Sequence, residues 1–381
     1  MRTYLNGRIF TGAQILDNQC VLTDDGKIVG IVERQNIPDT ATVVDLQGHL
    51  LAPAFMDIQI YGGNGRLFGE FPSVEALATT YDYCRAGGAM HFLPTVATNS
   101  DAVVFAAIEA VREYWQQGGA GVIGLHLEGP YINITKRGAH LPQFVKNDPS
   151  VSDLEKWLSK GKNIVKMMTL APELCSVAAV EYLQSNGVIV SAGHTNATFA
   201  EATAAFNGGD FEEKTQDFIH NPNKTIRVAT HLFNAMSPFG HRDLGVVGAI
   251  FAHPSVRVSL VADGFHVDFE AIKIAKQLLG ERLFLITDAV TENTEGLYSH
   301  RFDNGKYVVA DGTLSGSALT MQQAVKNCVE KVGISLEESL RMASLYPAQV
   351  MGLAEQLGRI EAGFTEDFVL LDADLNVVSC F

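Results

Sequence analysis

The middle of the chain alternates between short apolar segments and amphipathic segments of helical period. Short apolar runs bounded by turn signals are typical of buried strands, and a 3.6-residue apolar period is typical of surface helices. Eight strand candidates occur, at 55–59, 90–95, 122–128, 164–170, 188–193, 228–231, 256–262 and 283–287. Helical candidates lie between most of them, for example at 101–117, 175–186, 196–207 and 268–279. Eight strand-then-helix units predict an α/β fold of the (β/α)8 TIM-barrel type.

A doubly wound open sheet is the alternative, but such sheets usually carry a glycine-rich phosphate loop after the first strand. Neither G-x-G-x-x-G in that position nor G-x-x-x-x-G-K-[ST] occurs here. Two further helices are expected after the eighth strand, one over about 317–331 and one from a capping box at Ser335 and Glu338. The stretch 208–227 fits no unit, and we interpret it as a surface-loop insertion with a flap as its candidate role.

Both ends of the chain have the pattern of short strands. Near the N-terminus, apolar pieces at 20–22 and 27–32 flank the turn signal Asp24-Asp25-Gly26, and near the C-terminus similar pieces occur at 358–360, 367–371 and 376–378. The two ends could form unrelated edge hairpins. The prediction is instead one small β-sandwich domain built from 1–52 and 353–381, around a barrel domain spanning 53–352.

Composition restricts the class of protein and its partners. The net charge of −15, from 43 acidic and 28 basic residues, repels nucleic acid and anionic membrane, so a phosphorylated substrate would need a local basic pocket. No apolar run reaches the roughly 18 residues of a membrane span, and no signal peptide is expected. The five cysteines are scattered, without Cys-x-x-Cys spacing. This pattern predicts reduced thiols in a cytoplasmic protein, with any metal held by His and carboxylate.

Polar residues follow five of the predicted strands, at the barrel face where active sites lie. A single His at a strand end is more often structural, and a single Glu there usually caps a helix. Five such ends on one face favour a functional site. They are His126-Leu-Glu128, Ser191-Ala-Gly-His194, Thr230-His231-Leu-Phe-Asn234, Asp263-Gly-Phe-His266 and Thr287-Asp288.

Glu128, His194 and His231 supply one carboxylate and two imidazoles. Three protein ligands with one position left for water are the pattern of catalytic zinc and related divalent ions, which lower the pKa of that water. Asp288 is placed to accept the proton of the water and to pass it to a leaving nitrogen. His126 lies two residues before Glu128 and faces the same way, so we expect it deeper in the barrel as a supporting group rather than a ligand.

In these residues the chain resembles the N-acetylglucosamine-6-phosphate deacetylase family of the amidohydrolase superfamily. The resemblance runs nearly end to end, and its longest motifs are Gly124-Leu-His-Leu-Glu-Gly-Pro130 and Ala229-Thr-His-Leu-Phe-Asn-Ala-Met236. Each shorter motif means little alone, whereas their order along the chain is specific. The shorter motifs lie at 7–12, 53–57, 93–95, 191–197, 262–268, 287–289, 312–317 and 343–348.

The resemblance implies removal of the acetyl group from a sugar phosphate, by a barrel with a small β-sandwich. It implies one divalent ion on Glu128, His194 and His231, with zinc expected first and iron, manganese or cobalt also suited. It implies Asp288 as the acid–base and His140 as the group that polarises the acetyl carbonyl. The substrate-binding residues that it implies are Ala139, Asn234, Ala235, Arg242, Asp263, His266, Ser315, Gly316 and Ser317.

The resemblance also implies a homo-oligomer, a dimer or tetramer, with pockets near the subunit interface and Arg242 acting across it. From the residues alone, Arg242 would be assigned to a surface salt bridge with Asp243. The chain also has more residues between His194 and His231 than the family pattern, which affects a lid or the subunit contacts and leaves both ligands in place.

A second departure concerns the number of metal ions. Many amidohydrolases carry His-x-His after the first barrel strand and hold a second ion there, whereas this chain has Gln59 and Tyr61. One metal ion is therefore predicted.

Three other functions remain as alternatives. A dihydroorotase-like enzyme would use a carboxylated lysine at the end of the fourth strand, where Lys166 lies too early. N-acetylgalactosamine 6-phosphate differs from the gluco substrate at one hydroxyl, which the sequence does not resolve. A non-enzymatic scaffold would usually have lost its metal ligands, which this chain retains.

Overall fold

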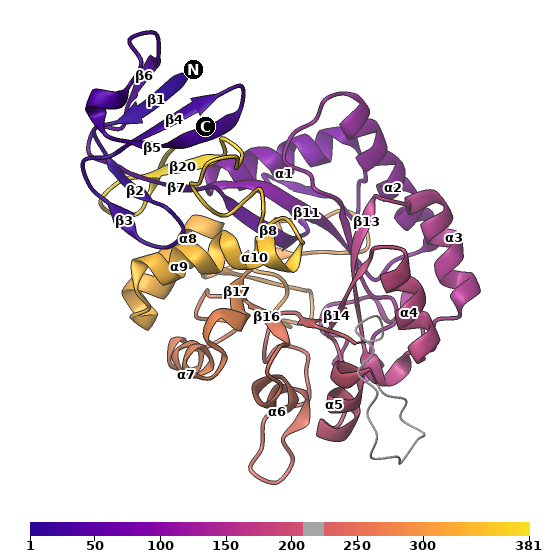
Figure 1. The fold of residues 1–381 in the computed structure, drawn as a ribbon. Helices are drawn as coiled ribbons and strands as arrows, with labels where there is room; N and C mark the ends of the chain where they lie inside the picture. The colour runs from indigo at the N-terminus through magenta and orange to yellow at the C-terminus, as the bar shows by residue number, and fades with distance from the viewer. Residues whose placement is uncertain (209–224) are drawn as a thin grey trace.

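The computed structural model describes residues 1–208 and 225–381, and its centre is a ring of eight parallel strands (Figure 1). The ring closes where Ile60 bridges Ala289 and where the Asp288 N–H donates to the Gln59 carbonyl at 2.9 Å. All eight predicted barrel strands are confirmed. They are β8 (Phe55–Ile60), β11 (Ala89–Ala97), β12 (Leu125–Glu128), β13 (Val165–Leu170), β14 (Ile189–Ala192), β15 (Val228–Ala229), β16 (Arg257–Leu260) and β17 (Leu283–Leu285).

Helices surround this ring (Figure 1). Most of them begin at a Ser, Thr or Asp whose side-chain oxygen accepts a backbone N–H of the first turn, which fixes the start of the helix. No helix among the described residues is long and apolar enough to cross a bilayer. The helices are α1 (Val74–Ala86), α2 (Asp101–Gln116), α3 (Val151–Gly161), α4 (Val177–Ser185), α5 (Phe199–Asn207), α6 (Gly245–Ala252), α7 (Phe269–Leu279), α8 (Met321–Asn327), α9 (Leu336–Ala343) and α10 (Leu345–Val350).

The two ends of the chain form separate β-sheets beside the barrel (Figure 1). A four-stranded sheet has the order β5 (Lys27–Val32), β4 (Cys20–Asp24), β1 (Arg2–Leu5), β6 (Thr42–Asp45). A five-stranded sheet joins both termini, because β20 pairs antiparallel with β7. Its order is β21 (Val377–Cys380), β20 (Phe368–Leu371), β7 (Leu50–Pro53), β2 (Arg8–Phe10), β3 (Ile15–Leu16). Sheets built from both termini are therefore confirmed, while the exact domain boundaries stay a prediction.

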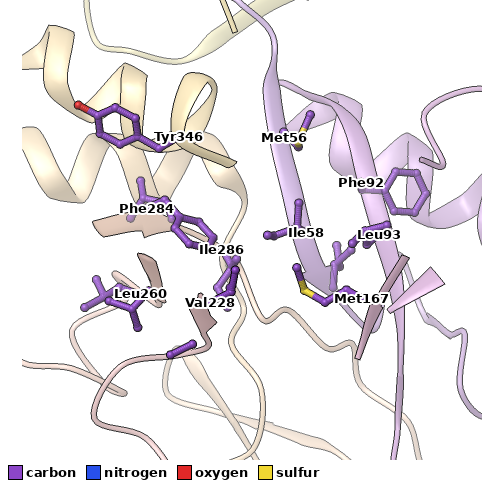
Figure 2. Close-up of a cluster of buried hydrophobic side chains, with 14 of the residues drawn as sticks. Met56, Ile58, Phe92, Leu93, Met167, Val228, Leu260, Phe284, Ile286 and Tyr346 are labelled. Atoms are coloured by element: carbon purple, nitrogen blue, oxygen red, sulfur yellow. The ribbon is translucent and has the colours of Figure 1, made fainter. Parts of the chain in front are cut away.

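The barrel interior is filled by apolar side chains rather than open. Figure 2 shows buried residues from opposite sides of the ring, among them Ile58 and Met167 on one side and Val228 and Ile286 on the other. Each of these side chains is at most 6% exposed. The packed interior fills the barrel below the strand ends, and active sites of this fold lie at its C-terminal face.

Two details differ from the sequence prediction. Residues 358–360 form no strand, because Gly358 has a φ of 85° and the chain turns there. Ser335 caps α9, but the carboxylate of Glu338 bonds to Lys276, Arg341 and Tyr346 instead of completing a capping box. The insertion predicted at 208–227 lies almost entirely outside the described residues, and so does its candidate role as a flap.

Replacement of Phe368 by Ala tests how far the C-terminal strand stabilises the terminal sheets. The Phe368 ring is fully buried and meets Tyr4 edge-on, with 5.2 Å between the ring centroids. We expect the free energy of unfolding to fall by about 3–5 kcal/mol in urea titrations. The exposed Val43→Ala, on β6, should change it by less than about 0.5 kcal/mol. Equal small effects in both variants would show that the C-terminal strand adds little stability.

Candidate active site

A cavity of about 190 Å3 opens at the C-terminal ends of the barrel strands. It brings together residues separated by up to 255 positions in the chain, from Tyr61 to Gly316, because parallel strands end on one face. Strands β12, β14, β15, β16 and β17 lead to five of them, which are Glu128, His194, His231, His266 and Asp288. The predicted site residues that line the cavity are Glu128, Ala139, His140, His194, His231, Asn234, Ala235, His266, Asp288, Ser315 and Gly316.

Three buried side chains form a compact group suited to a metal ion. Glu128 Oε1 lies 3.3 Å from His194 Nε2 and 3.0 Å from His231 Nε2, and the two nitrogens are 3.2 Å apart. Tetrahedral ligands at about 2.0 Å from a zinc ion are separated from one another by about 3.3 Å. The three predicted ligands therefore fit one small divalent ion, and they are the group of this kind found among the described residues.

Hydrogen bonds of the two imidazoles fix which ring nitrogen is free. His194 Nδ1 lies 2.9 Å from the Lys136 carbonyl, and His231 Nδ1 lies 3.1 Å from the Asn234 carbonyl. A carbonyl oxygen only accepts, so Nδ1 carries the proton in both rings. The lone pair of each Nε2 then points at the shared centre, which is the arrangement that a metal-ligating His needs.

His140, which lies beside these three side chains, has the opposite tautomer. The backbone N–H of Thr98 donates to His140 Nδ1 at 3.2 Å, so Nδ1 is unprotonated and Nε2 carries the hydrogen. Burial and the neighbouring His194 lower the pKa of His140 to about 4, which keeps the ring neutral. Its Nε2–H lies 3.2 Å from Glu128 Oε2 and lines the cavity. His140 is therefore a neutral hydrogen-bond donor next to the candidate metal position.

Gln59 links the metal group to Asp288, a role that the sequence reasoning missed. Its Nε2 donates to Glu128 Oε1 at 2.9 Å and to Asp288 Oδ1 at 2.7 Å, and its Oε1 accepts from Thr230 Oγ1. Burial and the charge of Glu128 raise the pKa of Asp288, and the Gln59 bond opposes that rise. The signal available in the sequence was the position of Gln59 at a strand end, where other amidohydrolases carry a ligand.

The two candidate imidazole ligands and Asp288 have backbone conformations that L-residues rarely adopt. The φ angles of His194, His231 and Asp288 are 50°, 34° and 53°. Such left-handed residues cost about 1–3 kcal/mol each and persist only where neighbouring bonds hold them. The Ser259 hydroxyl accepts from the His231 N–H, and Ser317 N–H donates to the Asp288 carbonyl. Each turn directs its side chain from a strand end into the cavity.

The other predicted substrate-binding residues differ in how they lie relative to the cavity. Asp263 lies behind His266 and accepts from its Nδ1 at 2.6 Å, while His266 Nε2 donates to the Ser315 carbonyl. Ser317 is fully buried and donates to the Thr287 carbonyl, so its side chain supports the wall instead of lining it. Arg242 is exposed and outside the cavity lining, and within the described parts of the chain it forms no ion pair, with Asp243 or otherwise.

His126 supports the barrel interior, in agreement with the sequence analysis. Its Nδ1 donates to the Ile58 carbonyl and its Nε2 accepts from Thr169 Oγ1 at 2.8 Å. Burial lowers its pKa to about 3. Both ring nitrogens are therefore used in structural hydrogen bonds, and the ring is neutral.

Glu173 was not considered from the sequence, yet its carboxylate joins two loops of the site. It accepts from Asn133 Nδ2 at 3.0 Å, from Thr195 Oγ1 at 2.5 Å and from the Asn196 N–H at 2.7 Å. The Asn133 N–H in turn donates to the carbonyl of His194 at 2.8 Å. Glu173 thus positions the loop that carries His194 against the loop after β12.

We expect Glu173→Gln to weaken metal binding about tenfold, because the amide keeps one acceptor oxygen and places an NH2 group against a donor. The dissociation constant should be measured by competition with a chromogenic chelator. Glu155→Gln, an exposed position on α3, is the matched control and should leave it unchanged. An unaltered constant in Glu173→Gln would show that the two loops hold their positions without this carboxylate.

Comparisons with known proteins identify the family of the chain. The family model described as amidohydrolase family matches residues 52–380, and that described as NagA composite domain matches residues 1–51. The chain is 36% identical to the N-acetylglucosamine-6-phosphate deacetylase of Danio rerio, over 97% of this chain and 93% of that protein. It is 30% identical to the N-acetylgalactosamine-6-phosphate deacetylase of Escherichia coli O157:H7, over 97% and 95%.

Similarity in structure extends over the same length. The crystal structure of N-acetylglucosamine-6-phosphate deacetylase from Pasteurella multocida superposes with a TM-score of 0.91 at 32% identity, over 100% of this chain and 97% of that one. A family model that covers most of the sequence, and relatives that cover nearly all of it, show that this chain belongs to the amidohydrolase family.

Proposed function

We propose that the chain hydrolyses the acetamide of N-acetyl-D-glucosamine 6-phosphate to D-glucosamine 6-phosphate and acetate, with one divalent ion, zinc first among the candidates. The observation that carries the proposal is the position of three metal-suited ligands beside a buried carboxylate, Asp288, and a neutral donor, His140. The relatives named for this reaction support the choice of substrate.

The ion would supply Lewis acidity to the amide carbonyl and a lowered pKa to the attacking water. His140 Nε2–H would donate to the carbonyl oxygen, where negative charge develops as the water oxygen bonds to carbon. Asp288 would take one proton from the water and deliver it to the nitrogen as the C–N bond breaks. Gln59 would hold Asp288 in place through the 2.7 Å hydrogen bond. The second proton of the water then passes from the acid group of the product to the amine, so the products are acetate and the protonated amine.

The sugar and its phosphate would lie toward Asn234, Ala235 and His266. Burial alone would lower the pKa of His266, but the hydrogen bond and charge of Asp263 raise it, so the two side chains form an ion pair at the cavity. Arg242 is exposed outside the cavity of its own chain, which supports a role in the pocket of a neighbouring subunit in a homodimer or homotetramer.

The five unpaired cysteines support a cytoplasmic location.

Deacetylation of N-acetylgalactosamine 6-phosphate is the second candidate, and the relative from Escherichia coli O157:H7 with that name favours it. Turnover of the two epimers would be compared with that of unphosphorylated N-acetylglucosamine, in protein loaded in turn with zinc, iron(II), manganese or cobalt. The proposal requires the gluco phosphate to have the highest kcat/KM. A higher value for the galacto epimer would assign the second function, and no turnover with any ion would refute both.

A further inference from the structure

One side of the cavity is an apolar wall, formed by Tyr61, Leu67, Ala97, Val290 and Tyr298. All five line the cavity, and they belong to one hydrophobic cluster that is separate from the barrel core. Leu67, Val290 and Tyr298 are at most 8% exposed. Apolar surface that faces a cavity favours an apolar part of a ligand, because burying it removes that surface from water.

The apolar wall begins directly beside the candidate metal ligands. Ala97 on β11 is paired in register with Glu128 on β12, and side chains of paired residues lie on the same face of a sheet. The Tyr61 hydroxyl donates to Glu128 Oε2. Val290 follows Asp288 by two residues, and its backbone N–H donates to the Ser317 carbonyl at 3.0 Å. The apolar wall therefore adjoins Glu128 and Asp288.

Tyr298 belongs to the apolar wall because its polar end is already used. Its hydroxyl donates to the Thr98 carbonyl at 2.6 Å and accepts from the Leu141 N–H at 3.4 Å. The carboxylate of Glu70 accepts the Tyr298 N–H at 2.6 Å. Because Thr98 also bonds to His140, the Tyr298 ring is fixed relative to the donor of the site, and its hydroxyl is bonded to backbone groups.

The polar side chains Asn234 and His266 follow β15 and β16, whereas Tyr61 and Ala97 of the apolar wall lie at the ends of β8 and β11, which are not neighbours of those strands in the ring. A substrate with its phosphosugar among these polar groups, and its amide between His140 and Asp288, has its acyl chain on the other side of the carbonyl carbon. On the basis of the proposed function, we propose that the apolar wall is the acyl subsite. It binds the alkyl part of the N-acyl group and determines which acyl length the enzyme prefers.

Substitutions at Ala97 and Val290 that add or remove methyl groups change the space available to that alkyl part. A single methylene in an apolar pocket changes discrimination by about 10- to 200-fold. Val290→Ala should therefore raise the ratio of kcat/KM for N-propionyl over N-acetyl glucosamine 6-phosphate by about tenfold. Ala97→Val should lower the ratio for N-acetyl over N-formyl by about tenfold.

The experiment measures kcat/KM for the N-formyl, N-acetyl, N-propionyl and N-butyryl compounds in wild type and both variants, with metal content and thermal unfolding as checks. The dissociation constants of the N-acetyl and N-propionyl compounds, measured calorimetrically in an Asp288→Asn background, should shift in the same direction. Val104→Ala is the matched control, since it makes the same truncation at a buried position on α2, away from the cavity. It should lower stability and leave every acyl ratio unchanged.

The two hypotheses fail in different ways. If wild type hydrolyses the N-acetyl compound but both folded variants keep the wild-type acyl ratios within twofold, the acyl subsite lies elsewhere and the proposed function stands. If metal-loaded wild type hydrolyses none of the four compounds, the proposed function is wrong and the acyl subsite is refuted with it.

Discussion

Asp288→Asn is expected to lower kcat by about 100- to 10,000-fold while metal content stays at the wild-type level, because the role proposed for Asp288 is that of a general acid–base and not of a ligand. The amide has the shape of the carboxylate, and its oxygen still accepts the bond from Gln59 Nε2. It cannot take up the proton of the water. Steady-state kinetics with N-acetylglucosamine 6-phosphate, paired with metal analysis of the same sample, measure both properties.

Asp374→Asn, at an exposed position near the C-terminus, is the matched control and should keep wild-type kcat. Two outcomes would contradict the role assigned to Asp288. Wild-type turnover in Asp288→Asn would place the proton transfer at another group. Loss of the metal together with activity would make Asp288 a ligand, although the described ligand group consists of Glu128 and two imidazoles.

Glu128→Gln is expected to weaken metal binding by more than about 100-fold and to abolish turnover at ordinary metal concentrations. Removing a residue that hydrogen-bonds to a metal ligand already lowers metal affinity by about 10- to 100-fold, and this change removes the candidate anionic ligand itself. Burial alone would raise the pKa of Glu128, but the three surrounding imidazoles lower it well below its ordinary value, so the wild-type carboxylate is charged. The neutral amide keeps the shape and loses that charge.

Metal titration and kinetics at several metal concentrations distinguish this loss from unfolding. In wild type, a chelator should remove activity and the added ion should restore it. Glu113→Gln, exposed on α2, should behave as wild type. Activity that persists in chelator-treated wild type would refute a metal-dependent reaction, and tight metal binding in Glu128→Gln would place the ion away from this carboxylate.

The amino-acid sequence determined the barrel and the residues at its active face. Apolar residues recur with the spacing of a strand in some segments and with that of a helix in others. The alternation of these segments along the chain gives the order of strands and helices, since each spacing is a local property of its segment. Parallel strands all end on one face, so Glu128, His194, His231 and Asp288 could be placed together before any coordinates were known. The strand predicted at 358–360 was wrong, because the chain turns at Gly358, which has a φ of 85°.

Only the tertiary structure decided how these side chains are held. The bond between Gln59 and Asp288 spans 229 positions, and that between Tyr298 and Thr98 spans 200. The proton positions on His140 and His194 follow from the backbone atoms that approach each ring. Residue type and spacing carry no record of such partners, because they come from distant loops whose positions are set by packing of the whole barrel. The chemistry of the site is therefore encoded locally, whereas its protonation, orientation and apolar wall result from the complete fold.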